Sequence, residues 1–482
     1  MIESLSSSFR DPSGFIFRHG STIYRQINSV YRETFDRFFD SDLYRELVDK
    51  GYLLSHEDVT SAAIPRAKSC HRILRPTQIA YISYPYEWCF SQLKDAAMLT
   101  LRIQTIALKH GWSLKDASAY NVQFINGRPG FIDLLSFEPY REGEPWVAYR
   151  QFCQHFLGPL ALMHYVDVGL AKLLVSNIDG VPLDIASRLL PFKTRLNMSL
   201  QTHIHLHAKF QSSYSDIAAG ETGDQKTNTA RGGRKISRAG LQGIIESLAS
   251  AIRRLHLPNA KTEWGNYYSK TNYSDSAGRA KRDLVSQFLR EINEPLGVIQ
   301  DLGSNTGEFS RVAAPHAKLV VSQDIDPIAV EKNYLQQKEE NGPQNVLPLL
   351  QDLSAPAPAI GWANAERASF IERAKCDVVM ALALIHHLAI GNNVPLKQAA
   401  NLFAKLGRWL IIEFVPKSDS QVIRMLTTRE DIFPNYSEKG FQAAFADKFT
   451  VERREVVEGS ERILYLMRVR SAEKMQPRVS EG

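Results

Sequence analysis

The sequence predicts an α/β protein whose C-terminal half holds a mostly parallel sheet. Five apolar runs of strand length alternate there with helical patterns. Most positions in these runs are apolar, which is typical of strands covered by helices on both faces of a parallel sheet. Two later runs flank the polar stretch 458–461, which predicts an antiparallel hairpin at the end of the sheet. The predicted strands are 297–302, 318–323, 346–350, 377–385, 409–415, 449–456 and 463–469, with helices at 327–339 and 395–406.

Length, composition and charge exclude several classes of protein. A chain of 482 residues is long for one domain, so two or more are expected. A hydrophobic content of 44% and a charged content of 23% are ordinary for a soluble globular protein. The chain has no run of about 18 apolar residues, so no membrane span is predicted. The net charge of +6 is mild and is not concentrated in a Lys/Arg block, so no nucleic-acid partner is predicted.

The cysteines and the first residues bear on the compartment. The four cysteines lie far apart and form no C-x-x-C pair, which argues against a disulfide framework or a zinc ribbon. The N-terminus has no basic stretch followed by an apolar one, so no signal peptide is predicted. We therefore expect a cytoplasmic protein.

One change in composition divides the chain. Residues 211–240 are polar, rich in Gly, Ser and Thr, and poor in large apolar side chains, so they cannot bury enough surface to offset their chain entropy. We predict a flexible linker there, between an α+β domain at 1–210 and the α/β domain at 241–470. Residues 471–482 are expected to be a disordered tail.

A strand, a glycine-containing turn and a helix follow one another around 297–313. This order brings backbone close to a nucleotide-like ligand at a helix N-terminus. The turn has Gly303 and Gly307 but lacks the other glycines of G-x-G-x-x-G, because Asn305 and Glu308 stand in their places. Since Glu308 would repel a pyrophosphate, a cofactor without phosphates fits better, and S-adenosylmethionine is the obvious one.

A carboxylate is expected at the end of the second strand. Asp324 lies 23 residues after Asp301, where a carboxylate in an open α/β sheet can accept hydrogen bonds from ribose hydroxyls. The alternative role for an Asp at this point is to cap the next helix. Asp326, directly before Pro327, fits that role better.

Four motifs in order resemble those of the class I S-adenosylmethionine-dependent methyltransferases, whose fold is Rossmann-like. They are the turn 301–307, the acidic pair around Ile325, the segment 351–353, and the strand that ends in His386 and His387. Asn305 departs from the usual middle glycine. Residues 263–273 resemble the cap that closes over the cofactor, although simple aromatic packing is an equal alternative. The resemblance implies these cofactor-binding residues: Asp301, Gly303, Ser304, Asn305, Gly307, Asp324, Ile325, Asp352 and Leu353.

Acceptor-side residues are expected at the carboxyl ends of the fourth and fifth strands, where open α/β sheets place ligands. The candidate catalytic residues are His386, His387 and Glu413. A base is needed only if the methyl acceptor must lose a proton. One histidine of the adjacent pair is expected to pack structurally. Glu413 stands in an apolar run, where a carboxylate is costly unless it is paired or lies at the site. A metal cluster of these three side chains is an alternative, but no metal is predicted in this domain.

The N-terminal region carries a fainter pattern. Asp116 and Asn121 precede a predicted hairpin, which is followed by Asp133 between apolar residues. This spacing is similar to the catalytic and metal-binding loops of protein-kinase-like phosphotransferases, in which Asp116 would be the base and Asn121 with Asp133 would hold magnesium for ATP. The glycine-rich loop and the residues expected beside Asp116 and Asp133 are missing. The alternative is that Asp116 and Asn121 cap a helix and a turn.

The whole chain resembles a bacterial family of long methyltransferase-like proteins that includes a rhizobial nodulation host-specificity protein. The runs at 82–88, 137–146 and 390–394 carry this resemblance. It implies methyl transfer from S-adenosylmethionine to a polar small molecule, a saccharide or a natural-product intermediate. A two-domain phosphotransferase/methyltransferase and a non-catalytic binding protein on a methyltransferase scaffold remain alternatives. The sequence does not predict the acceptor atom or the oligomeric state.

Overall fold

The chain forms two compact units. The structure, a computed structural model, describes residues 3–208, 235–258, 275–339, 343–427 and 429–470. Unit 1 comprises residues 1–260 together with 359–368, and unit 2 comprises 261–358 and 369–482. The predicted tail and most of the predicted linker lie outside the described residues.

The division into units differs from the predicted one at one helix and at the segment 359–368, both of which belong to unit 1. Helix α10 (Arg238–Arg254), which the prediction joined to the C-terminal domain, belongs to unit 1. It packs there against α3 (Phe90–Lys109), and Lys94 of α3 donates to the carbonyl oxygen of Leu255 at 2.6 Å. Six apolar side chains of α10 are buried, which holds it to unit 1 rather than leaving it beside the linker.

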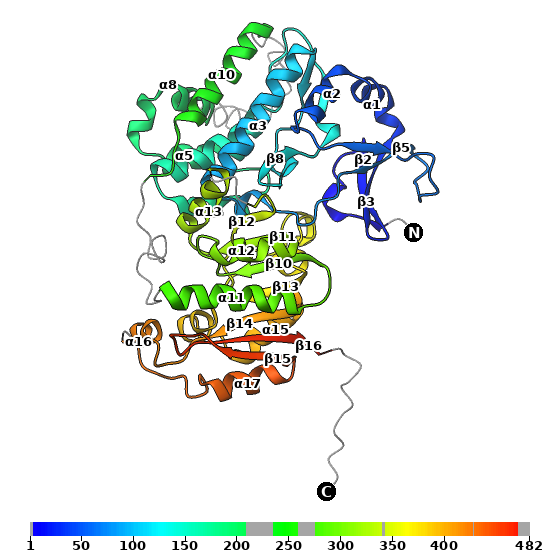
Figure 1. Cartoon of the computed structure of the whole chain (residues 1–482). Coiled ribbons are helices and arrows are strands. Elements are labelled where there is room, and N and C mark those ends of the chain that lie inside the picture. Colours follow the sequence, from blue (N-terminus) through cyan, green and yellow to red (C-terminus); the bar gives the residue numbers. More distant parts are fainter. Residues whose placement is uncertain (1–2, 209–234, 259–274, 340–342, 428, 471–482) are drawn as a thin grey trace. The chain divides into compact units, whose positions relative to one another are not determined.

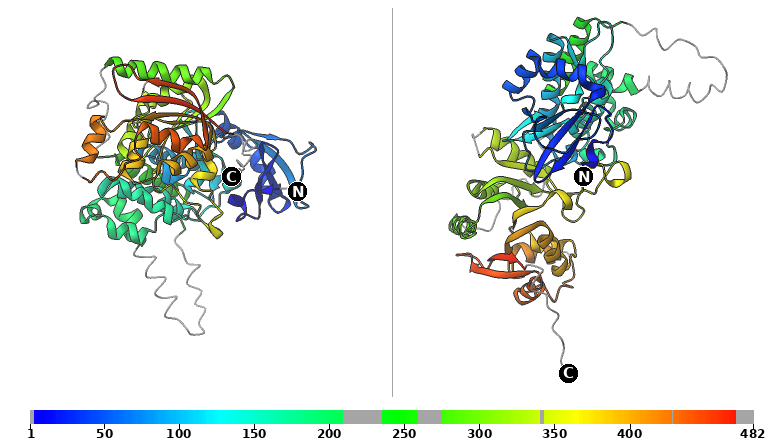
Figure 2. Two further views of the ribbon diagram at one scale, coloured as in Figure 1. Left: turned by 90° about the horizontal axis from the view of Figure 1, so that it is seen from below. Right: turned by 90° about the vertical axis from the view of Figure 1, so that its right-hand side faces the viewer.

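Unit 2 is built on one seven-stranded sheet with the order β12-β11-β10-β13-β14-β16-β15 (Figure 1). The first five strands in this order are parallel, and β16 runs antiparallel to both of its neighbours. Figure 2 shows the β15–β16 hairpin at the end of the sheet from two further directions. The strands are β10 (Leu296–Leu302), β11 (Ala317–Asp324), β12 (Val346–Leu350), β13 (Cys376–Ala381), β14 (Gly407–Phe414), β15 (Phe449–Val456) and β16 (Ile463–Val469).

Two apolar cores cover the two faces of this sheet. On one face, α11 (Asp275–Glu291) and α12 (Glu308–Ala313) pack through side chains such as Phe288 and Phe309. On the other face, α14 (Phe370–Arg373), α15 (Leu396–Leu406) and α17 (Glu438–Ala446) pack through side chains such as Phe403 and Phe441. The predicted helix 327–339 is α13 (Pro327–Glu339), and α16 spans Ser420–Leu426.

The fourth predicted strand is too long. Its residues were expected to stay extended to 385, but β13 ends at Ala381. Ala383 has φ of 50°, a left-handed conformation that no strand accommodates, so the chain turns there. A π-helical turn, η14 (His387–Gly391), follows, with His386 directly before it and His387 as its first residue.

Unit 1 combines an antiparallel sheet with helices. Its five strands have the order β1-β2-β3-β5-β4, and two short pairs, β6–β9 and β7–β8, follow α3. Asn126 and Gly127 both have positive φ and form the two-residue turn between β7 and β8. The strands are β1 (Glu3–Ser4), β2 (Gly14–His19), β3 (Thr22–Asn28), β4 (His56–Asp58), β5 (Cys70–Pro76), β6 (Trp112–Leu114), β7 (Val122–Ile125), β8 (Arg128–Phe131) and β9 (Phe137–Pro139). The helices before α10 include α1 (Arg32–Phe39), α2 (Asp42–Asp49), α4 (Tyr149–Phe152), α5 (Gly158–Tyr165), α6 (Leu173–Ser176), α7 (Leu183–Leu189) and α8 (Met198–Leu200).

The segment 359–368 is tied to unit 1 by charged side chains. Glu366, whose side chain is 2% exposed, accepts from Nε of Arg10 at 2.6 Å and from its Nη2 at 2.8 Å. The guanidinium of Arg367 lies 4.5 Å from the centre of the Tyr120 ring. Within the described part of the chain, no helix is both long enough and apolar enough to span a membrane.

Candidate cofactor and active site

The glycine turn is fixed to the second strand by backbone hydrogen bonds. The N–H groups of Gly303 and Ser304 both donate to the carbonyl oxygen of Gln323, at 2.8 and 2.9 Å. Gly303 has φ of 72°, and Asn305 has φ of 50°. Asn is one of the few residues that tolerate this region, so it replaces the family's middle glycine without breaking the turn.

Gly307 ends the turn and begins α12 in a left-handed conformation, with φ of 78°. A Cβ atom at this position would lie 2.4 Å from the side-chain amide of Asn333. The Asn333 amide donates in turn to Oγ of Ser322 at 2.8 Å. Gly307 therefore acts by letting the turn pack closely on its neighbours.

Asp324 sits where the sequence predicted it, at the end of β11. One carboxylate oxygen accepts from the N–H of Asn305 at 2.8 Å and the other from the N–H of Asp326 at 2.9 Å. The same carboxylate therefore also fixes the glycine turn. Asp326 caps α13, as predicted, by accepting from the N–H of Ile328 at 2.8 Å.

Two carboxylates of the site are buried and form no ion pair within the described part of the chain. Burial raises the pKa of Asp324 to about 6, against the hydrogen bonds that it accepts. Burial likewise raises the pKa of Asp301 to about 6, although Ser310 donates to it at 2.5 Å. Both groups are thus costly to ionise in the free protein, and hydrogen-bond donors or positive charge from a ligand would relieve that cost.

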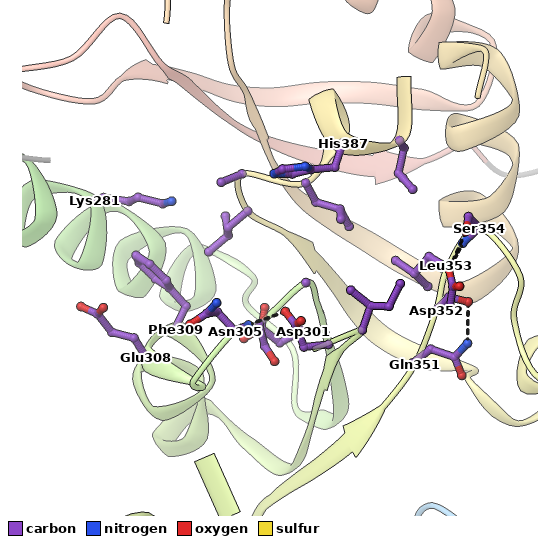
Figure 3. A pocket seen from close by; sticks show the side chains of 18 of the residues that line it. Lys281, Asp301, Asn305, Glu308, Phe309, Gln351, Asp352, Leu353, Ser354 and His387 are labelled. Atoms are coloured by element: carbon purple, nitrogen blue, oxygen red, sulfur yellow. Dashed lines mark hydrogen bonds between the residues drawn. The ribbon is translucent and has the colours of Figure 1, made fainter. Parts of the chain in front are cut away.

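A cavity of about 560 Å³ opens at the carboxyl ends of the parallel strands of unit 2. Eight of the nine predicted cofactor-binding residues line it, and the ninth, Gly307, supports the turn from behind. Figure 3 shows His387 above the turn, Lys281 and Phe309 on one side, and 351–354 on the other. The predicted residues in the lining are Asp301, Gly303, Ser304, Asn305, Asp324, Ile325, Asp352 and Leu353.

These residues fit S-adenosylmethionine. Ile325 is 55% exposed in the lining beside Asp324, and Leu353 lies near them, so an apolar surface for a flat base adjoins a carboxylate for ribose hydroxyls. Asp352 accepts from the N–H and the hydroxyl of Ser354, at 2.9 and 2.6 Å, which fixes this wall. Glu308, which the sequence predicts to repel a pyrophosphate, lines the cavity and pairs with Arg282.

The two histidines have different surroundings. His387 lines the cavity and is half-buried, and burial, with Arg462 nearby, lowers the pKa of His387 to about 4. His386 is 2% exposed and does not line the cavity, and its Nδ1 has no hydrogen-bond partner in the described part of the chain. Of the pair, only His387 is therefore placed to meet an acceptor, as a neutral imidazole at neutral pH.

Glu413 is buried behind the cavity. Its side chain is fully buried, lies outside the lining, and accepts from Nζ of Lys281 at 2.7 Å. Arg462 lies 3.9 Å from its other oxygen and pairs with Asp419 at 2.8 Å. The sequence predicted that Glu413 faces the site, and this prediction is wrong. Glu413 instead pairs with Lys281, and Lys281 lines the cavity.

The wall formed by α11 escaped the sequence analysis. Gly278, Arg279, Lys281 and Arg282 all line the cavity, and Lys281 lies 4.6 Å from the centre of the Phe309 ring. A basic amphipathic helix resembles any solvated helix face in a sequence. The one sequence feature that pointed to this wall was Glu413, because a carboxylate within an apolar strand needs a buried cation as its partner. The predicted cap at 263–273 lies outside the described residues.

The candidate residues of the N-terminal domain also come together. Asn121 hydrogen-bonds to Asp116 and donates to Oγ of Ser136 at 3.2 Å, and Ser136 donates to Asp133. Asp133, however, pairs with Arg25 of β3 at 2.5 Å. Burial disfavours ionisation of Asp133, but Arg25 and the hydrogen bonds outweigh it, so its pKa is lowered. No group of three or more metal-ligating side chains occurs among the described residues of either unit.

Comparison with known proteins identifies the family. The chain is 36% identical to nodulation protein NoeA of Rhizobium meliloti (strain 1021) over 464 residues, which cover 96% of this chain and 95% of NoeA. This chain belongs to the NoeA family. No protein-family model matches it.

Solved structures match part of the chain, with low TM-scores. N-methyltransferase NodS of Bradyrhizobium japonicum WM9 is 13% identical, with a TM-score of 0.30, over 41% of this chain and 99% of NodS. Magnesium protoporphyrin IX methyltransferase ChlM of Synechocystis PCC 6803, solved with S-adenosylhomocysteine bound, is 19% identical, with a TM-score of 0.30, over 42% of this chain and 91% of ChlM. TM-scores this low do not establish a relationship by themselves.

The sheet and the cavity of this NoeA-family chain identify the class of unit 2. A dinucleotide-binding Rossmann domain has six parallel strands in the order 3-2-1-4-5-6. In unit 2 the five parallel strands follow the first part of that order, but an antiparallel hairpin then closes the sheet, with β16 between β14 and β15. Unit 2 is a class I S-adenosylmethionine-dependent methyltransferase domain, and S-adenosylmethionine is its cofactor. The chain is accordingly a methyltransferase.

Proposed function

We propose that this NoeA-family protein methylates a polar small molecule, a saccharide or a natural-product intermediate in the cytoplasm. The observation that carries the proposal is the single cavity that joins the Asp324 end of the site to His387. A cofactor held by Asp324, Ile325 and Leu353 leaves His387 and Asn392 in the lining for an acceptor. The cytoplasmic location rests on four cysteines that are all free thiols.

S-adenosylmethionine supplies an electrophilic methyl group on a positively charged sulfur. The protein's contribution is then to position the acceptor and to exclude water from the cavity. The pKa of His387 is lowered to about 4, so its imidazole is unprotonated at neutral pH and can accept a hydrogen bond from an acceptor hydroxyl or amine, although it is a weak base. An acceptor that loses no proton would need only positioning.

The test is transfer of a labelled methyl group. Purified protein is incubated with methyl-labelled S-adenosylmethionine and the small-molecule fraction of a host-cell extract, and labelled products are separated and identified. We expect a labelled polar product with wild-type protein and none with D324A. A proton-accepting role predicts that H387A lowers the transfer rate by about 100-fold, the low end of the range for general-base catalysis, because a base with a pKa of about 4 is weak at neutral pH. H386A, which should retain far more activity if it folds, is the matched control.

Two outcomes would contradict the proposal. Labelling of the protein or nucleic-acid fraction of the same extract, with none in the small-molecule fraction, would remove the proposed acceptor class. Intact cofactor binding with no labelled product from any extract would favour a non-catalytic binding protein on this scaffold.

A phosphotransferase in unit 1 is a second candidate function. It is favoured by one observation, the hydrogen-bonded chain that joins Asp116, Asn121 and Asp133 beside the β7–β8 hairpin. Magnesium could reach Asp133 only by displacing Arg25. Thermal unfolding of the full chain with and without magnesium and ATP tests it. A stabilising shift that D133A abolishes would support phosphotransfer, and no shift with wild-type protein would remove it.

A further inference from the structure

A second recess of unit 2 lies at the opposite edge of the sheet from the cofactor cavity. It is formed where β13 and β14 begin and β16 ends, with α15 and the end of α17 beside it. Its volume is about 1640 Å³, against about 560 Å³ for the cofactor cavity. No motif and no step of methyl transfer accounts for it.

The recess is strongly basic. Seven lysines and arginines line it, against three carboxylates. Two of the carboxylates are already paired: Glu294 with Arg408 at 2.8 Å, and Asp447 with Lys397 at 3.0 Å. The five other cations form no ion pair within the described part of the chain, and all five are exposed; they are Lys375, Lys405, Lys448, Arg468 and Arg470.

The positive charges of the recess also lower the pKa values of two of its carboxylates. Lys397 lowers the pKa of Asp447, and Lys448 and Arg470 add to the effect from a distance. The pKa of Glu294 is lowered by the hydrogen bond from Trp409 and then by Arg408. A concave surface concentrates such a field, so an anion is drawn into the recess rather than spread over the surface.

The chemistry of the lining narrows the class of anion. Four of the seven cations are lysines, which bind phosphate as point charges without the planar fit that carboxylates find on arginine. Trp409 offers little platform for a stacked nucleic-acid base, because Arg468 lies 5.2 Å from its ring centre and its Nε1 donates to Glu294. No large apolar side chain of the lining is exposed, which disfavours insertion into a bilayer.

We propose that this basic recess binds a ligand that carries linked phosphate groups, and that Lys405, Lys448 and Arg468 are its main contacts. A chain of phosphates presents several charges at close spacing, which matches several cations around one recess. The phosphates could belong to a free oligophosphate or nucleotide, or to the head group of a diphosphate lipid. The site is independent of the methyl-transfer site, so either can be absent without the other.

The test uses inorganic tripolyphosphate and the full-length protein. Titration calorimetry at low and at physiological salt should show saturable binding that weakens as salt rises. K405E/K448E should weaken it by at least tenfold, because two attracting charges become repelling ones and the lining then holds five cations against five carboxylates. The matched control K318E/K439E alters two exposed lysines outside the recess and should leave the affinity within about twofold. Equal binding of S-adenosylhomocysteine by all variants shows that unit 2 is intact.

Further arms distinguish the sources and the competing classes. Pyrophosphate and ATP test the free-phosphate source, and flotation with vesicles that contain a diphosphate lipid tests the lipid source. No tripolyphosphate binding at low salt would overturn the proposal. So would an equal loss in K318E/K439E, which would mean attraction to net charge alone. Tighter binding of single-stranded RNA or of polyglutamate than of every phosphate ligand would also overturn it, because the ligand class would then be wrong.

Discussion

The buried carboxylates of unit 1 and of unit 2 differ in their partners and in the direction in which their pKa values are shifted. In unit 1, Asp133 is paired with Arg25 and its pKa is lowered. In unit 2, Asp301 and Asp324 form no ion pair among the described residues, and both line an open cavity. Burial raises the pKa of each to about 6, although Lys281 opposes the rise at Asp301. The first arrangement is complete within the protein. The second is completed by a ligand, which is the physical mark of a binding site rather than of a structural pair.

The largest loss of stability is expected where a mutation removes one partner of a buried ion pair. Lys281 and Glu413 are 4% and 0% exposed. Removing one partner of such a pair, as in E413L, should lower the free energy of unfolding by about 3–5 kcal/mol, whereas K281M/E413L should lower it by much less. Denaturant unfolding measures both. The exposed pair Lys397–Asp447 is the control, because K397A/D447A should change stability by less than about 1 kcal/mol.

The contrast between the two units predicts opposite responses to neutralisation. D133N leaves Arg25 without its carboxylate and should cost about 2–4 kcal/mol of stability at pH 7. D301N removes a charge that the free protein holds at a cost, so it should cost less than about 1 kcal/mol or stabilise. If D301N lost more free energy of unfolding than D133N, the interpretation of Asp301 as a ligand-binding carboxylate and of Asp133 as a structural one would be contradicted.

The glycine turn predicts a loss of both stability and binding. G307A places a Cβ atom against Asn333 at a left-handed position, and strain and overpacking together should cost about 2–4 kcal/mol. Cofactor affinity should fall as well, because the turn forms the floor of the cavity. Gly243 in α10 has no neighbour within 4 Å of its Cβ position, so G243A should be neutral or stabilising.

The smallest effect concerns pH. Asp324 has a pKa of about 6 in the free protein, and a bound cofactor favours its ionised form. Affinity for S-adenosylhomocysteine should therefore fall as pH drops below 6, by at most about tenfold per pH unit for one proton. Stability of the free protein runs the other way: a folded-state pKa raised above the usual ~3.9 means that these groups favour the folded state less as pH rises from about 4 to 6. D324N should remove most of the pH dependence of binding.

Regular elements were predictable because local sequence specifies them. The predicted bounds of β12, β15, β16 and α13 match the structure, since each is delimited by turn or capping residues such as Asp326. The end of β13 was wrong by several residues, because an alanine with positive φ carries no sequence signal. Only tertiary packing explains why the chain turns at Ala383.

The candidate site was predictable on the donor side and not on the acceptor side. Cofactor residues follow strand ends, whose position in a parallel sheet is fixed by topology. Glu413 was noticed as anomalous, but its partner Lys281 lies more than a hundred positions earlier, on a helix that looks solvated in the sequence. Which histidine faces the cavity depended on the turn after β13, which could not be foreseen.

Binding of S-adenosylhomocysteine to full-length wild-type protein and to D324A, measured by titration calorimetry at pH 7.5, tests the central claim most directly. Hydrogen bonds to a charged group are worth about 1.5–3 kcal/mol each, so the loss of the Asp324 contacts predicts an affinity about 100-fold lower or more. D377N, at the opposite edge of the sheet, should bind as the wild type does. Equal binding by D324A and wild type, or no binding by the wild type, would contradict the assignment of the cofactor site.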